Sequence, residues 1–230
     1  VRLFEVGKVF SIGKNGSEDF QEREVIGAAV TGEWGHASWQ SPAQPVDFFA
    51  LKGVLEAYFT ELNCTDRIRF VATDAIGQLH PGQTAYIYLG EELIGFIGKI
   101  HPVIQKELDL SDTFVFELLV EPLLAEGLQE RVIQSVPKFP SMTRDIALLV
   151  PVTMVHATLE AVIKEQAGQY LQSITLFDVY KGEHVKEGYQ SLAYSIRFLN
   201  KEATLQEEEV KQAMDRIQTA LVALEDVTIR

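Results

Sequence analysis

The sequence has few features that could form disulfide bonds or span a membrane. Its single cysteine, Cys64, excludes a disulfide within the chain and fits a reducing cytosol. No apolar run approaches the roughly 20 residues that a membrane-spanning helix needs, so we expect no membrane partner and a cytoplasmic location. Repeats and low-complexity tracts are also lacking, we expect no leader, and the strand-like start Val1–Phe4 suggests a chain cut from a longer one.

Basic residues are scarce as well. The chain has 20 Lys and Arg against 33 Asp and Glu, a net charge of −13. Residues 137–230 hold 10 basic and 13 acidic residues, whereas residues 1–136 hold 10 and 20. Each phosphate contact adds up to about −0.9 to the salt dependence of nucleic-acid binding. The composition therefore excludes a strong non-specific nucleic-acid binder and leaves room for a specific, local contact.

Candidate metal ligands and nucleophiles are dispersed along the chain. The five histidines lack the spacing that brings three or four ligands to zinc, and none lies near Cys64 in sequence to activate it. We therefore expect no metal site and no catalytic residue. Gly95 and Gly98 fall inside an expected β-hairpin, not between a strand and a helix, so they form no phosphate loop. The histidines are His36, His80, His101, His156 and His184.

The first 136 residues predict an antiparallel sheet and a long helix. The helix follows Pro45, because apolar residues recur at helical spacing from Phe48 to Leu62 and Asp47 lies near the positive end of the helix dipole. The Gly-rich stretch 13–17 suits a hairpin connection. The expected strands are residues 3–10, 24–31, 67–72, 85–89, 93–100 and 114–120.

Two tryptophans, Trp34 and Trp39, precede this helix in a polar segment. They either anchor a loop on the core or form an interface with a partner. The loop is the favoured interpretation, because aromatic rings most often supply buried area.

Residues 137–230 predict the order strand, helix, strand, strand, helix, strand. The first helix is expected to have Thr153 as its cap, Val155 as the first residue of its apolar stripe and Gly168 at its end. The second has a capping box at Thr204–Glu207 and an apolar stripe from Val210 to Leu224. Two helices on one side of a four-stranded antiparallel sheet give the ferredoxin-like arrangement. The expected strands are residues 144–150, 173–180, 191–198 and 227–230.

Period-two alternation separates the two faces of that sheet. The apolar residues from Leu192 to Phe198 share the helix-facing side, and in the preceding strand we expect Thr175, Phe177 and Val179 on the same side. The other face is then open, and it carries donors, an acceptor and an aromatic ring, the groups that read single-stranded RNA. Residues expected on this face are Asp178, Tyr180, Ser191, Arg197 and Arg230, with a basic edge from Arg144, Lys181, Lys138 and Lys186.

Eight segments resemble the C-terminal region of bacterial phenylalanyl-tRNA synthetase beta chains, and they occur in the order of that family. In the first part they are LFEVGKVF from Leu3, PVDFFALKG from Pro45, HPGQTAYIYLG from His80 and IGFIGKIHP from Ile94. In the second they are PKFPSMTRDIALLV from Pro137, FDVY from Phe177, SLAYSIRF from Ser191 and TLQEEEV from Thr204. The resemblance implies an α+β chain. Residues 1–136 would form a class II synthetase-like, non-catalytic core domain, followed by a ferredoxin-fold anticodon-binding domain at residues 137–230.

The resemblance also implies partners and site residues. The partners are tRNA(Phe) and the alpha subunit, which performs aminoacylation with ATP and magnesium in an assembly of two alpha and two beta chains. No cofactor is expected in this part, because the family's editing site and magnesium-binding module lie further towards the amino terminus. The resemblance assigns RNA contact to Asp178, Ser191 and Arg230, and the sheet pattern adds Tyr180, Arg197, Arg144 and Lys181.

Two other classes of function remain open from the sequence. The βαββαβ pattern also occurs in small-molecule regulatory modules that sense amino acids. A purely structural protein that assembles a larger complex would have the same elements without an RNA contact.

Overall fold

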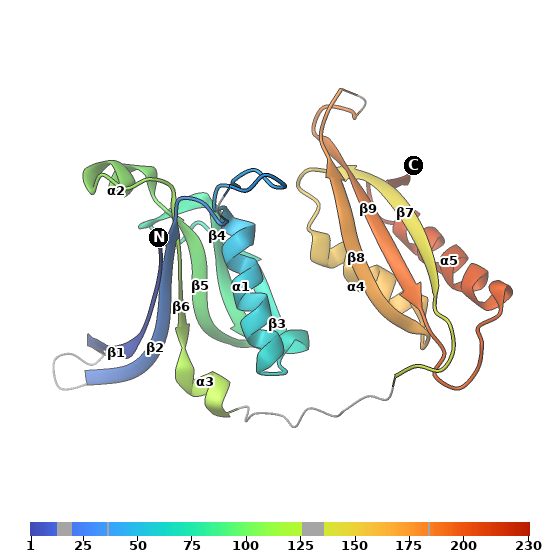
Figure 1. The fold of residues 1–230 in the computed structure, drawn as a ribbon, viewed down its shortest axis with the longest axis horizontal. Coiled ribbons are helices and arrows are strands. Elements are labelled where there is room, and N and C mark those ends of the chain that lie inside the picture. Colours follow the sequence, from blue (N-terminus) through green and yellow to red (C-terminus); the bar gives the residue numbers. More distant parts are fainter. Residues whose placement is uncertain (13–19, 36, 126–135, 184) are drawn as a thin grey trace. The chain divides into compact units, whose positions relative to one another are not determined.

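The computed structural model describes residues 1–12, 20–35, 37–125, 136–183 and 185–230. The chain divides into two compact units, Val1–Val132 and Ile133–Arg230. Each unit has its own antiparallel sheet (Figure 1). The domain boundary expected after residue 136 lies close to this division, and the hairpin connection expected at residues 13–17 lies outside the described residues.

The first unit is a six-stranded sheet with the strand order β1-β2-β6-β5-β4-β3. Helix α1 (Phe48–Glu61) buries Leu51, Leu55 and Phe59 in the core on one face of this sheet. Its first turn is fixed by Asp47, whose Oδ1 accepts the Ala50 amide at 2.7 Å. The strands are β1 (Arg2–Ile12), β2 (Phe20–Thr31), β3 (Ile68–Ala72), β4 (Leu79–Leu89), β5 (Glu92–Ile100) and β6 (Thr113–Leu119), and the short helices, which the sequence pattern did not predict, are η1 (Thr65–Arg67), α2 (Pro102–Glu107) and α3 (Val120–Ala125).

Two glycines of β5 allow its neighbours to approach closely. A Cβ at Gly95 would lie 2.0 Å from the Glu117 carbonyl oxygen, and one at Gly98 would lie 2.8 Å from the Thr84 hydroxyl oxygen. Any side chain at these positions would push the strands apart. Their expected location inside a hairpin strand is confirmed, and packing accounts for both glycines.

The second unit is a four-stranded sheet with the order β10-β7-β9-β8 and antiparallel neighbours throughout. Helices α4 and α5 lie on one side of this sheet (Figure 1). This is the ferredoxin-like arrangement expected from the sequence. Its elements are β7 (Met142–Pro151), α4 (His156–Ala167), β8 (Leu171–Tyr180), β9 (Tyr189–Phe198), α5 (Glu207–Val222) and β10 (Thr228–Ile229).

The core of this unit confirms the face assigned to β9. Leu192, Tyr194, Ile196 and Phe198 are each at most 3% exposed and pack with the apolar faces of both helices. Tyr194 has a polar partner at the edge of the core, because its hydroxyl lies 2.8 Å from Nδ1 of the exposed His156 and the two rings stack with centroids 5.5 Å apart. The sequence pattern did not identify this pair.

Both helix starts differ from the expectation. Thr153 does not cap α4; the helix begins after Val155, which is 61% exposed and does not belong to the buried stripe. In α5 the capping box lies two residues later than expected, with Glu209 Oε2 accepting the Gln206 amide at 2.9 Å. Leu205 explains the shift, since it is 2% exposed and its insertion into the core delays the first helical turn.

The buried Tyr194 phenol predicts a loss of stability at alkaline pH. Burial, aided by the nearby Glu160 carboxylate, raises the pKa of Tyr194 from 10.0 to about 12. Because the folded state favours the neutral phenol, the stabilisation is fully present below pH 10 and is lost as the pH rises through 12. We expect the free energy of unfolding to fall between pH 10 and pH 12 by about 2–3 kcal/mol more in the wild type than in Tyr194→Phe.

Urea denaturation followed by far-UV circular dichroism measures this difference. The substitution removes the phenol but keeps the ring, so the other tyrosines and the lysines titrate alike in both proteins. Parallel stability curves for the two proteins across this pH window would show that Tyr194 titrates normally.

Candidate nucleic-acid interface

The open face is the side of the β10-β7-β9-β8 sheet that α4 and α5 leave uncovered. Its middle is formed by two small side chains, Ala147 of β7 and Ala193 of β9, which pair directly. Asp178 of β8 pairs with Ala193 on one side, and the Arg230 amide donates to the Ala147 carbonyl oxygen at 2.9 Å on the other. Side chains in one cross-strand row share a face, so a carboxylate and a guanidinium border a shallow apolar floor.

A β-bulge at Phe177 decides which side chains of β8 reach this face. Before the bulge, Thr175 pairs with Ser195 on the open face, so the expectation that Thr175 points to the helices is wrong. The register shifts between Leu176 and Asp178, which leaves Phe177 without a cross-strand partner and 57% exposed. Its expected inward position is therefore also wrong.

The bulge nevertheless places Asp178 and Tyr180 on the open face, opposite Ala193 and Ser191. Strict alternation from the inward Leu176 would have turned both side chains towards the helices. One extra residue reverses the alternation, which is how bulges re-aim side chains beside functional sites. The sequence argument reached the correct face for these two residues by an incorrect route.

Two other residues expected on the open face are less available to a ligand than the sequence suggests, one because it is buried and one because it is hydrogen-bonded. Ser191 pairs with Leu149 and Tyr180 on this face, but it is only 8% exposed. A contact between Ser191 and RNA therefore requires neighbouring side chains to move. Arg197 is exposed on the open face, and its Nε donates to the Ser141 hydroxyl oxygen at 2.8 Å. This bond fixes the side chain at the start of β7.

The basic edge is smaller than the sequence suggests. Arg144 pairs with Ile196, a helix-facing residue, and forms an ion pair with Glu207 at the start of α5. It therefore lies on the helix side, and the expectation that it adds positive charge beside the open face is wrong. Lys181 follows Tyr180 directly and is exposed, so it stays at this edge.

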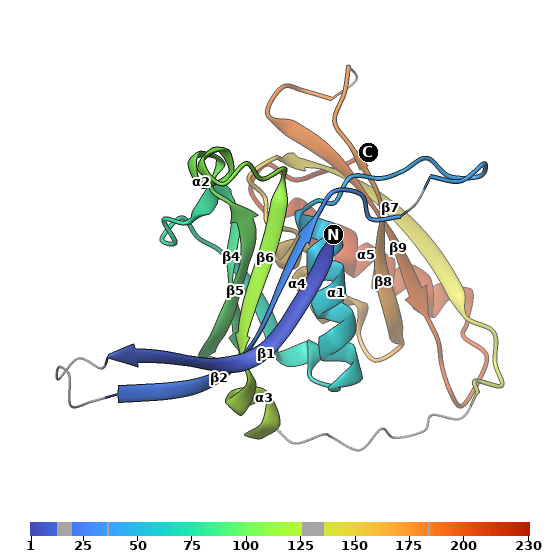
Figure 2. The ribbon, with the colours of Figure 1, turned by 60° about the vertical axis from the view of Figure 1, so that its left-hand side comes forward.

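The first unit carries a different kind of surface, which we call the β1–β2 apolar surface. Among the described strands, β1 pairs with β2 alone, and the two extend away from α1 (Figure 2). Where they pass α1, an apolar cavity of about 250 Å³ lies between the helix and the strands. The residues of this surface, which share one face of the two strands and are each more than half exposed, are Phe4, Val6, Phe10, Ile12 and Phe20.

The two tryptophans have different environments. Trp34 lines the apolar cavity, and the Arg2 guanidinium lies 4.7 Å from its ring centroid, so it anchors its loop as expected. Trp39 is 91% exposed, and the expectation that it also anchors the loop is wrong.

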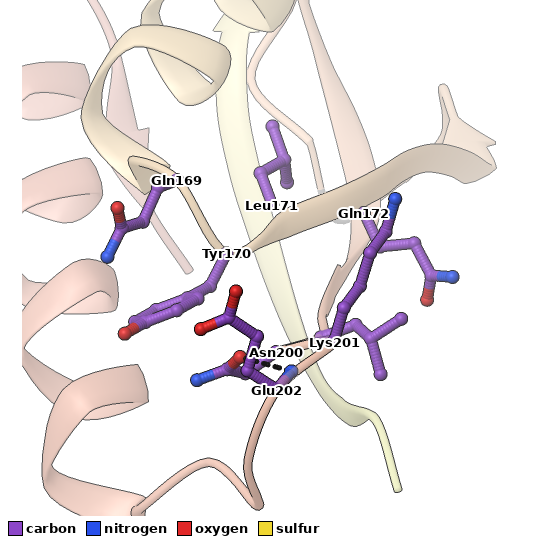
Figure 3. Close-up of a pocket in the computed structure, with 8 residues that line it drawn as sticks. Gln169, Tyr170, Leu171, Gln172, Asn200, Lys201 and Glu202 are labelled. Atoms are coloured by element: carbon purple, nitrogen blue, oxygen red, sulfur yellow. Dashed lines mark hydrogen bonds between the residues drawn. The ribbon is translucent and has the colours of Figure 1, made fainter. Parts of the chain in front are cut away.

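A polar surface cavity of about 580 Å³ lies where β8 begins and β9 ends (Figure 3). The Leu199 amide donates to the Tyr170 carbonyl oxygen at 2.8 Å, and Asn200 Oδ1 accepts the Glu202 amide at 2.9 Å. These two hydrogen bonds join residues that line the cavity to one another. Tyr180 ends β8, so the cavity lies at the opposite end of that strand and does not join the row that contains Asp178 and Arg230.

Among the described residues, no three His, Cys, Asp or Glu side chains converge as a metal site would require. No helix within the described ranges is both long enough and apolar enough to cross a membrane.

Comparisons with known proteins match both units. Residues 1–120 match the family described as the phenylalanyl tRNA synthetase beta chain CLM domain, and residues 137–230 match the ferredoxin-fold anticodon binding domain. The phenylalanine–tRNA ligase beta subunit of Bacillus subtilis is 47% identical over 226 residues, which are 98% of this chain and 28% of that protein. The beta subunits of Bacillus licheniformis and Listeria innocua are 44% and 40% identical, over 97% and 100% of this chain and 27% and 28% of their own lengths.

These matches place the chain in a family of aminoacyl-tRNA synthetase subunits. It belongs to the phenylalanine–tRNA ligase beta-subunit family. The chain spans little more than a quarter of the length of the relatives named above. Among solved structures, a pyrrolysyl-tRNA synthetase from Desulfitobacterium hafniense aligns over 55% of this chain and 42% of its own at 14% identity, with a TM-score of 0.38, which is too remote to inform the fold.

The placement of Arg144 on the helix side predicts a pairwise coupling with Glu207. Both side chains are partly exposed, so the ion pair should contribute no more than about 1 kcal/mol to the free energy of unfolding. In a double-mutant cycle of Arg144→Ala and Glu207→Ala, urea denaturation should give a coupling of about 0.2–1 kcal/mol. The matched cycle of Arg197→Ala with Glu207→Ala should be additive. Coupling of Glu207 to Arg197 but not to Arg144 would show that Arg197 lies on the helix side and Arg144 does not.

Proposed function

We propose that the second unit binds the anticodon region of tRNA(Phe) through its open face, and that the first unit holds the alpha subunit of phenylalanine–tRNA ligase. The observation that carries the proposal is the bulge at Phe177. It presents Asp178 and Tyr180 on the same face as Arg197 and Arg230, in a unit that matches an anticodon-binding family.

The chemistry of the open face suits a few unpaired bases and does not suit a duplex. A carboxylate accepts hydrogen bonds from base amino or imino groups, a guanidinium donates to base or phosphate oxygens, and an aromatic ring stacks. The net charge of −3 in residues 137–230 makes non-specific attraction weak. Recognition therefore depends on the geometry of Asp178, Tyr180 and Arg230 more than on the total charge.

The β1–β2 apolar surface supports the scaffolding role. An edge strand of 11 residues without one buried side chain is a site where another chain can pack or pair. We assign this surface to the alpha subunit, within an assembly of two alpha and two beta chains in the cytoplasm. The alpha subunit performs aminoacylation with ATP and magnesium, and this part of the beta chain supplies no catalytic residue and holds no cofactor. Its contribution to the rate is positioning of the tRNA relative to the active site.

Two other functions lack comparable support. A small-molecule regulatory module needs an enclosed, largely apolar pocket with a few convergent polar groups, whereas the 580 Å³ cavity is a polar surface hollow in which Asn200 Oδ1 already accepts the Glu202 amide. A purely structural role leaves the re-aimed Asp178 and Tyr180 without a purpose.

Replacement of Asp178 by asparagine should weaken tRNA selection. The change keeps the shape of the side chain but removes a charged acceptor, whose hydrogen bond to a base contributes about 1.5–3 kcal/mol. In the synthetase assembled from full-length beta and alpha subunits, we expect KM for tRNA(Phe) in the charging reaction to rise roughly 10- to 100-fold. Formation of phenylalanyl-adenylate, measured by pyrophosphate exchange, should stay unchanged.

Asp215→Asn on α5 provides the matched control, because Asp215 is exposed on the helix side of the same unit. The control should leave KM for tRNA(Phe) unchanged. A parallel loss of charging and adenylate formation in Asp178→Asn would indicate general damage and would count against an anticodon contact.

Charges placed on the β1–β2 apolar surface should weaken assembly. The variant Phe4→Asp/Phe10→Asp should raise the dissociation constant of the full-length beta subunit for the alpha subunit at least about tenfold, since buried aromatic anchors dominate interfaces. Its melting temperature should change little, because the two rings are 77% and 68% exposed. Val103→Asp on α2, where the wild-type side chain is 57% exposed, is the control and should assemble normally. Analytical ultracentrifugation measures the dissociation constants of both variants for the alpha subunit. Normal assembly of the double variant would show that this surface is not part of the interface.

A further inference from the structure

Two glycines in the connection between β8 and β9 serve different purposes. Gly188 has a φ of +81°, and a Cβ built on it would meet no atom within 4 Å. Glycine is needed there for the left-handed backbone. Gly182 has no positive φ, so its backbone would accept alanine without strain. The reason for a glycine at position 182 must therefore be space.

The space at Gly182 is occupied by the Tyr180 ring. A Cβ on Gly182 would lie 2.4 Å from the Tyr180 hydroxyl oxygen, 2.6 Å from Cζ and 3.2 Å from Cε1. Gly182 lies two residues beyond the end of β8, at a bend whose carbonyl oxygen accepts the Val185 amide at 2.9 Å, and this bend brings its backbone under the ring of Tyr180. This packing is consistent with the 40% exposure of Tyr180. A methyl group at position 182 would force the ring to leave this position.

We propose that Gly182 is a positioning residue that holds the Tyr180 ring against the backbone, so that the ring offers a fixed stacking surface to an unpaired base. The proposal rests on the RNA-binding role of the open face. A ring held before binding loses less rotamer freedom when a base stacks on it, which strengthens binding without adding a contact. Gly182 thus acts through Tyr180 and needs no contact with the RNA.

A double-mutant cycle tests this dependence in the synthetase assembled from full-length beta and alpha subunits. Stacking on an aromatic ring is worth a factor of roughly 5 to 100 in affinity, so Tyr180→Ala should raise KM for tRNA(Phe) within that range. Gly182→Ala should raise it by a similar factor, with kcat and pyrophosphate exchange unchanged. In the Tyr180→Ala background, Gly182→Ala should have no further effect, because the ring it displaces is gone.

Gly188→Ala is the matched control in the same connection. It adds the same methyl group and strains the backbone, but it displaces nothing, so whatever effect it has on KM should be the same with and without Tyr180. Melting temperatures of all variants separate binding effects from loss of folding. An additive cycle for Gly182→Ala with Tyr180→Ala, or an unchanged KM in Gly182→Ala alone, would overturn the positioning role.

A second measurement does not depend on tRNA. In the 230-residue chain, nuclear Overhauser contacts should join the Tyr180 ring protons to the Gly182 Hα protons. In the Gly182→Ala variant, the contacts between this ring and the Hα proton at position 182 should disappear. If the contacts are seen in the wild type but Tyr180→Ala leaves KM unchanged, the stacking role of Tyr180 in the proposed function fails. If the contacts are missing from the wild type, the ring is not held by Gly182.

Discussion

The open face depends on one local constraint, the extra residue that β8 carries at Phe177 relative to β9. A strand with a single buried face has a fixed alternation, and the inward Ile174 and Leu176 would dictate that Asp178 and Tyr180 also point inward. The bulge at Phe177 reverses this alternation for the last residues of the strand, so that Asp178 and Tyr180 point to the open face. The core keeps its apolar contacts from the first half of β8, and the open face gains a carboxylate and a ring from the second half.

The two units deal with apolar surface in opposite ways. The second unit buries its apolar side chains under α4 and α5 and leaves an open face on which a carboxylate, a guanidinium and an aromatic ring surround small side chains. The first unit buries one side of its central strands under α1 but leaves the β1–β2 apolar surface exposed. A polar, sparsely charged face suits a specific RNA contact, whereas an apolar edge strand suits a protein partner. The proposed division of labour follows from this difference.

The sequence predicted those features that follow from composition and periodicity within a single element. The buried face of β9, the stripe of α5 and the position of Asp47 at the start of α1 belong to this group. Tertiary contacts decided the remainder. Thr204 begins the usual sequence motif of a capping box, but the box forms at Gln206, one residue after the buried Leu205. The sequence similarly does not decide on which face of the sheet Arg144 lies. Its ion pair with Glu207 at the start of α5 places it on the helix side.

Crosslinking from the open face tests the proposed interface most directly. A photoreactive amino acid would replace Thr228, which is exposed and pairs with Leu149 on the open face, in the assembled synthetase bound to tRNA(Phe). The same group at Lys211, exposed on α5, provides the comparison. If the open face is the interface, position 228 crosslinks to nucleotides of the anticodon loop and position 211 does not. Crosslinks from position 211 alone, or from position 228 only to nucleotides outside the anticodon arm, would contradict it.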